Sequence, residues 1–167
     1  YVNLAEAYYS AKIYDVAIQW AQKAFSQLAN VDEEGQGYSA EMLAMAFIEV
    51  NKIDSAKHFI RIAQTIGAKY NNEYLINRST GHLGRLYLKT KRYDSAEYYL
   101  TKTVQNSKGK HLSDILLPAT LALSRCLLVR GNLKDALIHA RWAHTSSLEI
   151  KNKVIATESC MLLASLY

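Results

Sequence analysis

Leucine, a small residue and a large apolar residue recur along the chain with a period of about forty positions. The leucines stand 39, 40, 40 and 40 residues apart, at Leu4, Leu43, Leu83, Leu123 and Leu163. The next residue is small each time: Ala5, Ala44, Gly84, Ser124 and Ala164. Three positions later a large apolar residue follows: Tyr8, Phe47, Tyr87, Leu127 and Tyr167. Since such spacings repeat one face of an α-helix, each repeat is predicted to contain a helix.

A second apolar pattern follows the first within each repeat. An alanine stands twelve positions after the small residue, at Ala17, Ala56, Ala96 and Ala136. In the second repeat Ala56, Ile60 and Ala63 share one helical face. Small residues on both helices allow their backbones to approach closely, and larger side chains fill the flanks of the crossing. Each repeat is therefore predicted to be a helical hairpin, and the fold class to be all-α.

Turn-forming residues fall between the two predicted helices of each repeat. Asn51 and Gly131 suit the left-handed backbone position that ends a helix. Asp15, Asp54 and Asp94 should lie in the first turn of the next helix, where the helix dipole favours negative charge.

Two other segments indicate where helices begin. Residues 31–37 read as the longest polar loop, with Asp32, Glu33 and Glu34 in solvent. Pro118 suits the first position of the seventh helix. If that helix begins near Ser113 instead, Pro118 should kink it.

The repeats predict how the chain is organised. One hairpin cannot bury its apolar face alone, but stacked hairpins can. We expect a single array over residues 1–167, with units at about 1–36, 37–76, 77–116 and 117–156 and a partial unit at 157–167. This amounts to about four helical hairpins plus one further helix. Both ends fall within a repeat, so the chain is expected to be a fragment of a larger protein.

Composition narrows the class of protein. Half of the 167 residues are hydrophobic and only one is proline, which excludes a disordered or collagen-like chain. No apolar run reaches the ~18 residues of a membrane span. The residues after Tyr1 show no basic start, apolar stretch and cleavage site, so no secretory signal is expected. We therefore expect a cytoplasmic protein without a membrane partner. Cys126 and Cys160 are expected to be inert thiols.

The charge of the chain is unevenly distributed. Residues 1–75 hold six Lys and Arg against nine Asp and Glu, whereas residues 76–167 hold fourteen against six. A basic half can attract nucleic acid or acidic peptides. Because no run of five basic residues occurs, we favour solvated helix surfaces and consider nucleic acid the less favoured partner.

Motifs for catalysis are missing from the sequence. It contains no phosphate-binding glycine loop and no nucleophile elbow. His139 and His144 are five residues apart without a further ligand at metal spacing. We expect a protein that is not an enzyme and has neither a metal site nor a cofactor.

The repeat resembles the tetratricopeptide repeat (TPR) family. The resemblance rests on Leu-Ala-x-x-Tyr at 4–8, Leu-Ala-x-x-Phe at 43–47, Leu-Gly-x-x-Tyr at 83–87, and Tyr-Asp-x-Ala at 14–17 and 93–96. It implies a right-handed α-α superhelix, or TPR-like solenoid. The ~40-residue unit exceeds the usual ~34 and is similar to the long-repeat subclass of bacterial signalling regulators, kinesin light chains and polarity adaptors. HEAT-type repeats share the length but not the residue order.

The resemblance also implies a function and a binding face. TPR arrays commonly bind protein partners along a concave face built from the first helix of each repeat. Carried over, that face includes Glu41, Met45, Glu49, Arg78, His82, Arg85, Lys89 and Arg125. We expect a non-enzymatic protein–protein interaction module whose partner is a protein or peptide with acidic groups, with self-association as a further option. The alternative is a sensory or regulatory TPR region of a bacterial signal-transduction protein.

Overall fold

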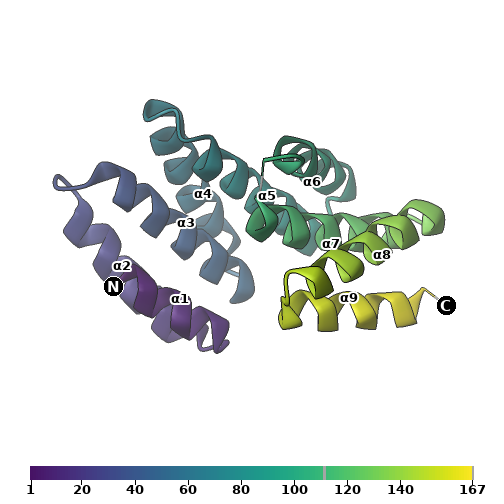
Figure 1. The fold of residues 1–167 in the computed structure, drawn as a ribbon. Coiled ribbons are helices and arrows are strands. Elements are labelled where there is room, and N and C mark those ends of the chain that lie inside the picture. Colours follow the sequence, from purple (N-terminus) through teal and green to yellow (C-terminus); the bar gives the residue numbers. More distant parts are fainter. Residues whose placement is uncertain (111, 167) are drawn as a thin grey trace. The chain divides into compact units, whose positions relative to one another are not determined.

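Helices account for all regular structure that the computed structural model describes, which covers residues 1–110 and 112–166 (Figure 1). They are α1 (Val2–Ser10), α2 (Tyr14–Leu28), α3 (Glu33–Glu49), α4 (Ile53–Lys69), α5 (Glu73–Lys89), α6 (Tyr93–Ser107), α7 (Ser113–Val129), α8 (Leu133–Glu149) and α9 (Lys153–Ser165). The all-α prediction is confirmed. Tyr167, the last member of the large apolar series, lies outside the described residues.

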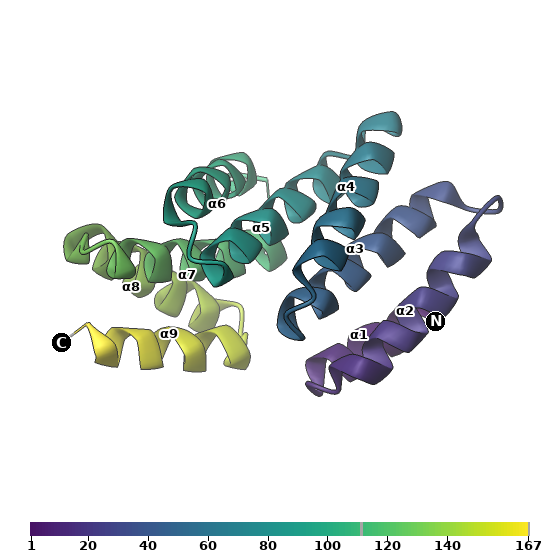
Figure 2. The same cartoon turned by 180° about the vertical axis from the view of Figure 1, so that it is seen from behind.

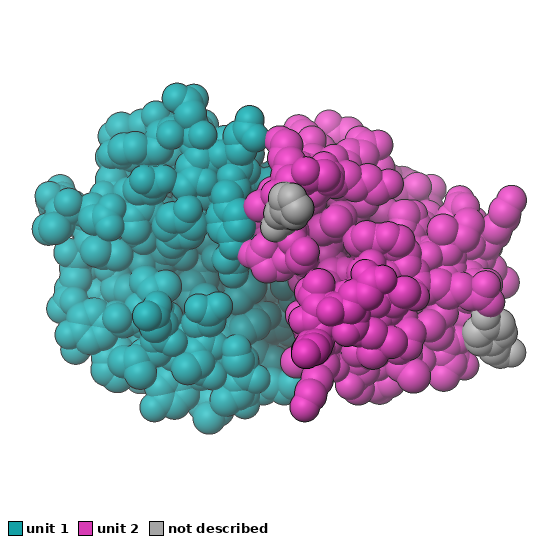
Figure 3. Space-filling view, viewed as in Figure 1, with its two compact units in different colours: residues 1–86 teal, residues 87–167 magenta. Residues whose placement is uncertain are grey.

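The chain divides into two compact units, coloured separately in Figure 3. Unit 1 comprises residues 1–86, with α1 to α4 and most of α5. Unit 2 comprises residues 87–167, with the end of α5 and helices α6 to α9. The single array over the whole chain stays a prediction.

Consecutive helices pack as hairpins within each unit, as the two opposite views show (Figures 1 and 2). In unit 1, α1 packs on α2 and α3 on α4; in unit 2, α7 packs on α8. The alanines predicted at the crossings are fully buried: Ala17, Ala56, Ala96 and Ala136. The prediction that these alanines face inward, away from water, is confirmed.

Each unit has its own apolar core. In unit 1, Leu43, Phe47 and Ile60 pack between α3 and α4. In unit 2, Leu100 and Leu123 pack between α6 and α7. A separate cluster in unit 2 joins α7 to α9 through Leu117, Leu121, Ile155 and Leu162. Burial of these side chains is the main force that holds the short helices in place.

Left-handed residues recur at the same point of successive hairpin turns. Asn51 and Gly131 have φ angles of 59° and 81°, as the sequence predicted. Lys12 and Lys91 occupy the equivalent places with φ angles of 62° and 59°. The aspartates expected in the following first turns are also there: Asp15, Asp54 and Asp94.

The predicted polar loop at residues 31–37 is wrong, because α3 already begins at Glu33. The Asp32 carboxylate caps that helix by accepting a hydrogen bond from the Gly35 backbone N–H at 2.9 Å. Glu33 and Glu34 are not simply solvated either: Glu33 accepts from Lys69, and Glu34 accepts from Asn72 at 2.7 Å. These contacts tie the start of α3 to the α4–α5 turn.

Pro118 lies inside α7, which begins at Ser113. Its placement at the first position of the helix was therefore wrong. Proline cannot donate the backbone hydrogen bond that an interior helix residue makes. The kink expected for this case stays a prediction.

Within the described residues, none of the helices combines the length and the apolar character that crossing a bilayer requires.

Candidate functional site

The first helices of the second and third repeats meet at a buried polar cluster in unit 1. Glu41 on α3 is 2% exposed, and His82 on α5 is 7% exposed. The Glu41 Oε1 atom contacts both the His82 Nε2 atom and, at 3.0 Å, the Arg78 Nε atom. The His82 Nδ1 atom is also buried, and no hydrogen-bond partner reaches it within the described residues. The cluster therefore joins α3 to α5 through one carboxylate.

Burial, the contact between Glu41 and His82, and the nearby arginines shift the pKa values in this cluster. Burial alone would raise the pKa of Glu41, but the contact with His82 and the Arg78 and Arg85 charges outweigh it and lower that pKa. Burial lowers the pKa of His82. The Glu41 carboxylate raises this pKa, but the charges of Arg85 and Arg78 lower it further, so the pKa is lowered overall. A neutral imidazole that donates from Nε2 also avoids placing a second, unpartnered N–H at the buried Nδ1 atom.

A second polar cluster joins three helices of unit 1. The Glu49 Oε1 atom on α3 accepts a hydrogen bond from the Tyr9 hydroxyl on α1 at 3.2 Å. The same oxygen accepts one from the Arg85 Nη2 atom on α5 at 2.7 Å. Burial raises the pKa of Tyr9 despite the nearby Arg85 charge, so the phenol stays protonated and able to donate.

The Tyr74 ring packs against Arg78 of the buried cluster. The Arg78 guanidinium lies 5.7 Å from the Tyr74 ring centroid, and its Nη1 atom donates to the Tyr74 hydroxyl at 2.9 Å. The Tyr74 ring packs against Tyr38 on α3, with 6.3 Å between the ring centroids. This arrangement restrains the Arg78 side chain from two sides.

Six partly buried residues of α1, α3 and α5 form what we name the tyrosine–arginine face: Tyr9, Tyr38, Glu49, Tyr74, Arg78 and Arg85. Tyrosine and arginine are the residue types enriched where proteins bind one another most tightly. Ion pairs and ring contacts hold both arginines in place before any partner binds, which reduces the entropy lost on binding.

Sequence reasoning placed Glu41, Glu49, Arg78, His82 and Arg85 on one face. The structure joins them as two clusters of unit 1, Glu41 with Arg78 and His82, and Glu49 with Arg85. Sequence reasoning did not include Tyr38 or Tyr74 in that face. Tyr38 stands forty positions before Arg78, so the repeat register was the signal that could have found it. Tyr74 precedes Arg78 by one helical turn.

The other predicted face residues lie elsewhere. Met45 is in the core of unit 1 and only 8% exposed, so it supports α3 more than it offers an apolar surface. Lys89 and Arg125 belong to unit 2 and are exposed. Arg125 pairs with Glu158 on α9, with 3.0 Å between its Nη2 atom and Glu158 Oε2. That these residues bind a partner stays a prediction.

Residues 1–110 and 112–166 contain no group of three His, Cys, Asp or Glu side chains that could hold a metal ion. The thiols differ in environment: Cys126 is buried, with its pKa raised by burial, whereas Cys160 is exposed.

Comparison with known proteins identifies the architecture. No protein-family model and no curated protein sequence matches the chain. Among solved structures, the apo form of RapI superposes with a TM-score of 0.80 over 99% of the chain, at 20% sequence identity. The chain has a TPR-like helical-repeat fold. The prediction drawn from the Leu-small-x-x-aromatic pattern is thereby confirmed.

The TPR-like chain is also similar to kinesin light chain repeats. A putative kinesin light chain from Podosopora anserina with nearly identical TPR-like repeats superposes with a TM-score of 0.69 at 18% identity, over 99% of this chain and 83% of that one. A point variant of that protein gives the same TM-score and identity, with 82% of its length covered. The chain spans 61% of the length of RapI. At these identities the likeness concerns the fold alone.

Proposed function

We propose that this TPR-like chain is a non-enzymatic interaction module that binds a segment of a partner protein on the tyrosine–arginine face. The observation that carries the proposal is the arrangement of Tyr9 and Arg85 around Glu49, beside Arg78 stacked on Tyr74. These groups are partly exposed, they are held by neighbouring helices, and their chemistry suits peptide recognition better than catalysis.

The partner segment should carry acidic groups. A guanidinium can bind two carboxylates at once, as Arg130 does with Asp94 and Glu97 in unit 2. Arg85 could therefore hold a carboxylate of the partner while keeping Glu49, without breaking the contact between α3 and α5. Tyr9, Tyr38 and Tyr74 would add ring contacts with little loss of side-chain entropy.

Selected peptides test the proposal. Twelve-residue peptides isolated from a displayed random library by binding to the full chain would be titrated in a calorimeter. Arg85→Gln should weaken binding of the selected peptide at least tenfold, about 1.4 kcal/mol. Tyr74→Ala should also weaken it, because the ring contact is lost.

Lys57→Gln is the matched control, since Lys57 is exposed on α4 and outside the face. Its affinity should equal that of the unmodified chain, and thermal unfolding should show that all variants are folded. If Arg85→Gln and Tyr74→Ala both bound the peptide as tightly as the unmodified chain, the tyrosine–arginine face would not be the binding site. Self-association and a place in a bacterial signal-transduction protein stay predictions.

A further inference from the structure

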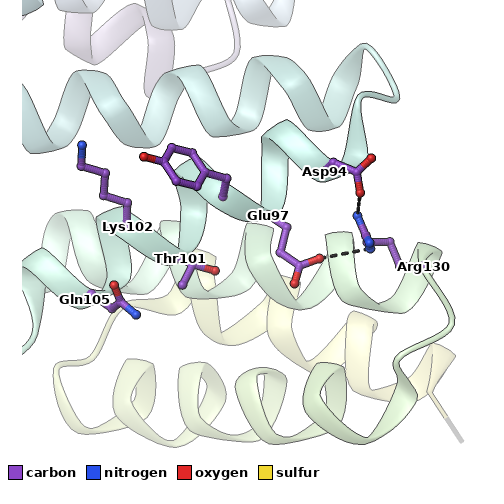
Figure 4. A pocket seen from close by; sticks show the side chains of 7 residues that line it. Asp94, Glu97, Thr101, Lys102, Gln105 and Arg130 are labelled. Atoms are coloured by element: carbon purple, nitrogen blue, oxygen red, sulfur yellow. Dashed lines mark hydrogen bonds and ion pairs between the residues drawn. The ribbon is translucent and has the colours of Figure 1, made fainter.

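One side of α6 carries a groove that the proposed function does not use. One hollow of about 520 Å³ is lined by seven residues, Asp94, Glu97, Tyr98, Thr101, Lys102, Gln105 and Arg130 (Figure 4). A second hollow of about 510 Å³ shares Asp94 and Arg130 with the first and extends over Lys91 and Arg92. All of these residues belong to unit 2. We name the two hollows together the α6 groove.

Arg130 satisfies both carboxylates of the groove. It pairs with Asp94 through Nη1 and with the Glu97 Oε2 atom at 3.1 Å through Nε. Lys102 lies toward the end of the first hollow away from Arg130, as does Gln105 (Figure 4). Within the described part of the chain, Lys102 makes no hydrogen bond or ion pair with another side chain. One cation of the groove is therefore available to an external anion.

An exposed aromatic side chain, Tyr98, lines the first hollow between Glu97 and Lys102 in sequence. Tyr98 is 61% exposed, and its ring packs edge-on against Tyr99 with 5.0 Å between the centroids. Tyr99 in turn stacks on Tyr87 at 5.5 Å. Because Lys102 follows Tyr98 by one helical turn, the ring and the ammonium share one side of α6. An exposed tyrosine that packs against a neighbouring ring offers a favourable contact to a bound peptide.

The charges of the groove favour an acidic peptide over nucleic acid. Its four cations, Lys91, Arg92, Lys102 and Arg130, exceed its two carboxylates, Asp94 and Glu97. A nucleic-acid backbone would bring a phosphate to every sugar and would meet both carboxylates. A peptide can place its carboxylates on the cations alone and its backbone N–H groups near Asp94 and Glu97.

We propose that the α6 groove is a second binding site, which takes an extended acidic peptide segment with one carboxylate on Lys102 and an apolar side chain against Tyr98. Gln105 and Thr101 can both donate and accept hydrogen bonds, so they suit the backbone of such a segment. This site shares no residue with the tyrosine–arginine face, so an experiment can disprove either proposal without affecting the other.

The test uses the full chain and a fluorescent ten-residue peptide that alternates glutamate and leucine. Fluorescence anisotropy should show saturable binding, with the dissociation constant at least fivefold higher for Lys102→Gln and for Tyr98→Ala. Both side chains are exposed, so the variants should keep the fold, which circular dichroism would verify. A loss of binding in Arg85→Gln but not in Lys102→Gln would assign the peptide to the tyrosine–arginine face and overturn the α6-groove site.

Lys134→Gln on α8 is the matched control, because it removes one exposed lysine of unit 2 outside the groove. It should bind the peptide like the unmodified chain. Unchanged binding by Lys102→Gln, or an equal loss in Lys134→Gln, would overturn the proposal. So would a twelve-nucleotide single-stranded DNA that displaces the peptide at equal concentration, or no binding of the glutamate–leucine peptide at all.

Discussion

At the scale of single residues, Lys91 holds a backbone conformation that favours glycine. It follows α5 with a φ angle of 59°, a region in which a Cβ atom is crowded by the neighbouring carbonyl. We expect Lys91→Gly to raise the free energy of unfolding by roughly 0.5–1 kcal/mol, the relief of strain exceeding the added freedom of the unfolded chain. Denaturant unfolding of the full chain measures the change.

Lys102→Gly is the comparison for Lys91→Gly, because Lys102 lies within α6 in ordinary helical structure. That change should lower the free energy of unfolding by about 1 kcal/mol. If both substitutions destabilised the protein equally, the left-handed conformation of Lys91 would be contradicted.

Gly37 is a residue whose lack of a side chain is required by packing. A Cβ atom built there would lie 2.8 Å from both the Ile66 Cγ2 and the Leu75 Cδ2 atoms. We expect Gly37→Ala to lower the free energy of unfolding by about 1–3 kcal/mol through overpacking, despite the higher helix propensity of alanine. A stability equal to that of the unmodified chain in thermal and denaturant unfolding would contradict this close approach.

At the scale of helices, the crossing of α3 and α4 depends on Ala56. Its side chain is fully buried, within the core of unit 1. Ala56→Leu should therefore cost about 1–3 kcal/mol by forcing the two helices apart. Ala68→Leu on the exposed side of α4 is the matched control and should be close to neutral in the same thermal unfolding experiment. Equal midpoints for the two variants would mean that the helix register is wrong.

The contact between α3 and α5 should weaken in acid. The pKa of buried His82 is lowered, so below the ordinary value of about 6.5 the unfolded chain binds a proton that the folded chain does not. The pKa of Glu41 is lowered as well, so a further loss should follow below about 4.3 as its carboxylate is protonated. The free energy of unfolding should thus fall as the pH drops from 7 to 5.

Replacement of His82 isolates its share of this pH dependence. His82→Gln keeps a donor for Glu41 but cannot titrate, so the fall in stability between pH 7 and 5 should become shallower. The fall should not vanish, because burial also lowers the pKa of His139. An unchanged slope in His82→Gln would contradict the assigned charge of the cluster.

At the scale of the whole molecule, the positive charge is concentrated in one unit. Residues 87–167 hold twelve Lys and Arg against six Asp and Glu, whereas residues 1–86 hold eight against nine. Part of the excess is already paired, as Arg125 is with Glu158 and Arg130 with Asp94. We expect duplex DNA to bind only at low salt and to be released near ~150 mM, where surface charges are screened. Anisotropy showing submicromolar binding at that salt concentration would contradict a protein-binding role for unit 2.

The sequence by itself determined the elements and their order. The spacing of Leu43, Ala44 and Phe47 predicted a helix, and Ala56 predicted a helix crossing. Such patterns can be recognised in the sequence because the residues of each one lie within a few positions of one another. Asn51 and Gly131 likewise indicated left-handed turns through their own backbone preferences. The sequence did not predict the start of α3, where Asp32 supplies a cap, Glu33 pairs with Lys69 at the end of α4, and Glu34 accepts from Asn72 in the α4–α5 turn.

Only the tertiary structure decided which partners the charged residues of the predicted binding face contact and how deeply they are buried. Periodicity placed Glu41 and Arg78 on helix faces, but these residues are 37 positions apart, and their contact depends on how α3 and α5 cross. The same pattern could have left both side chains in water. Packing instead buried His82 on Glu41 and placed Arg78 against Tyr74, because a side chain's surroundings are set by neighbouring helices that local spacing does not specify.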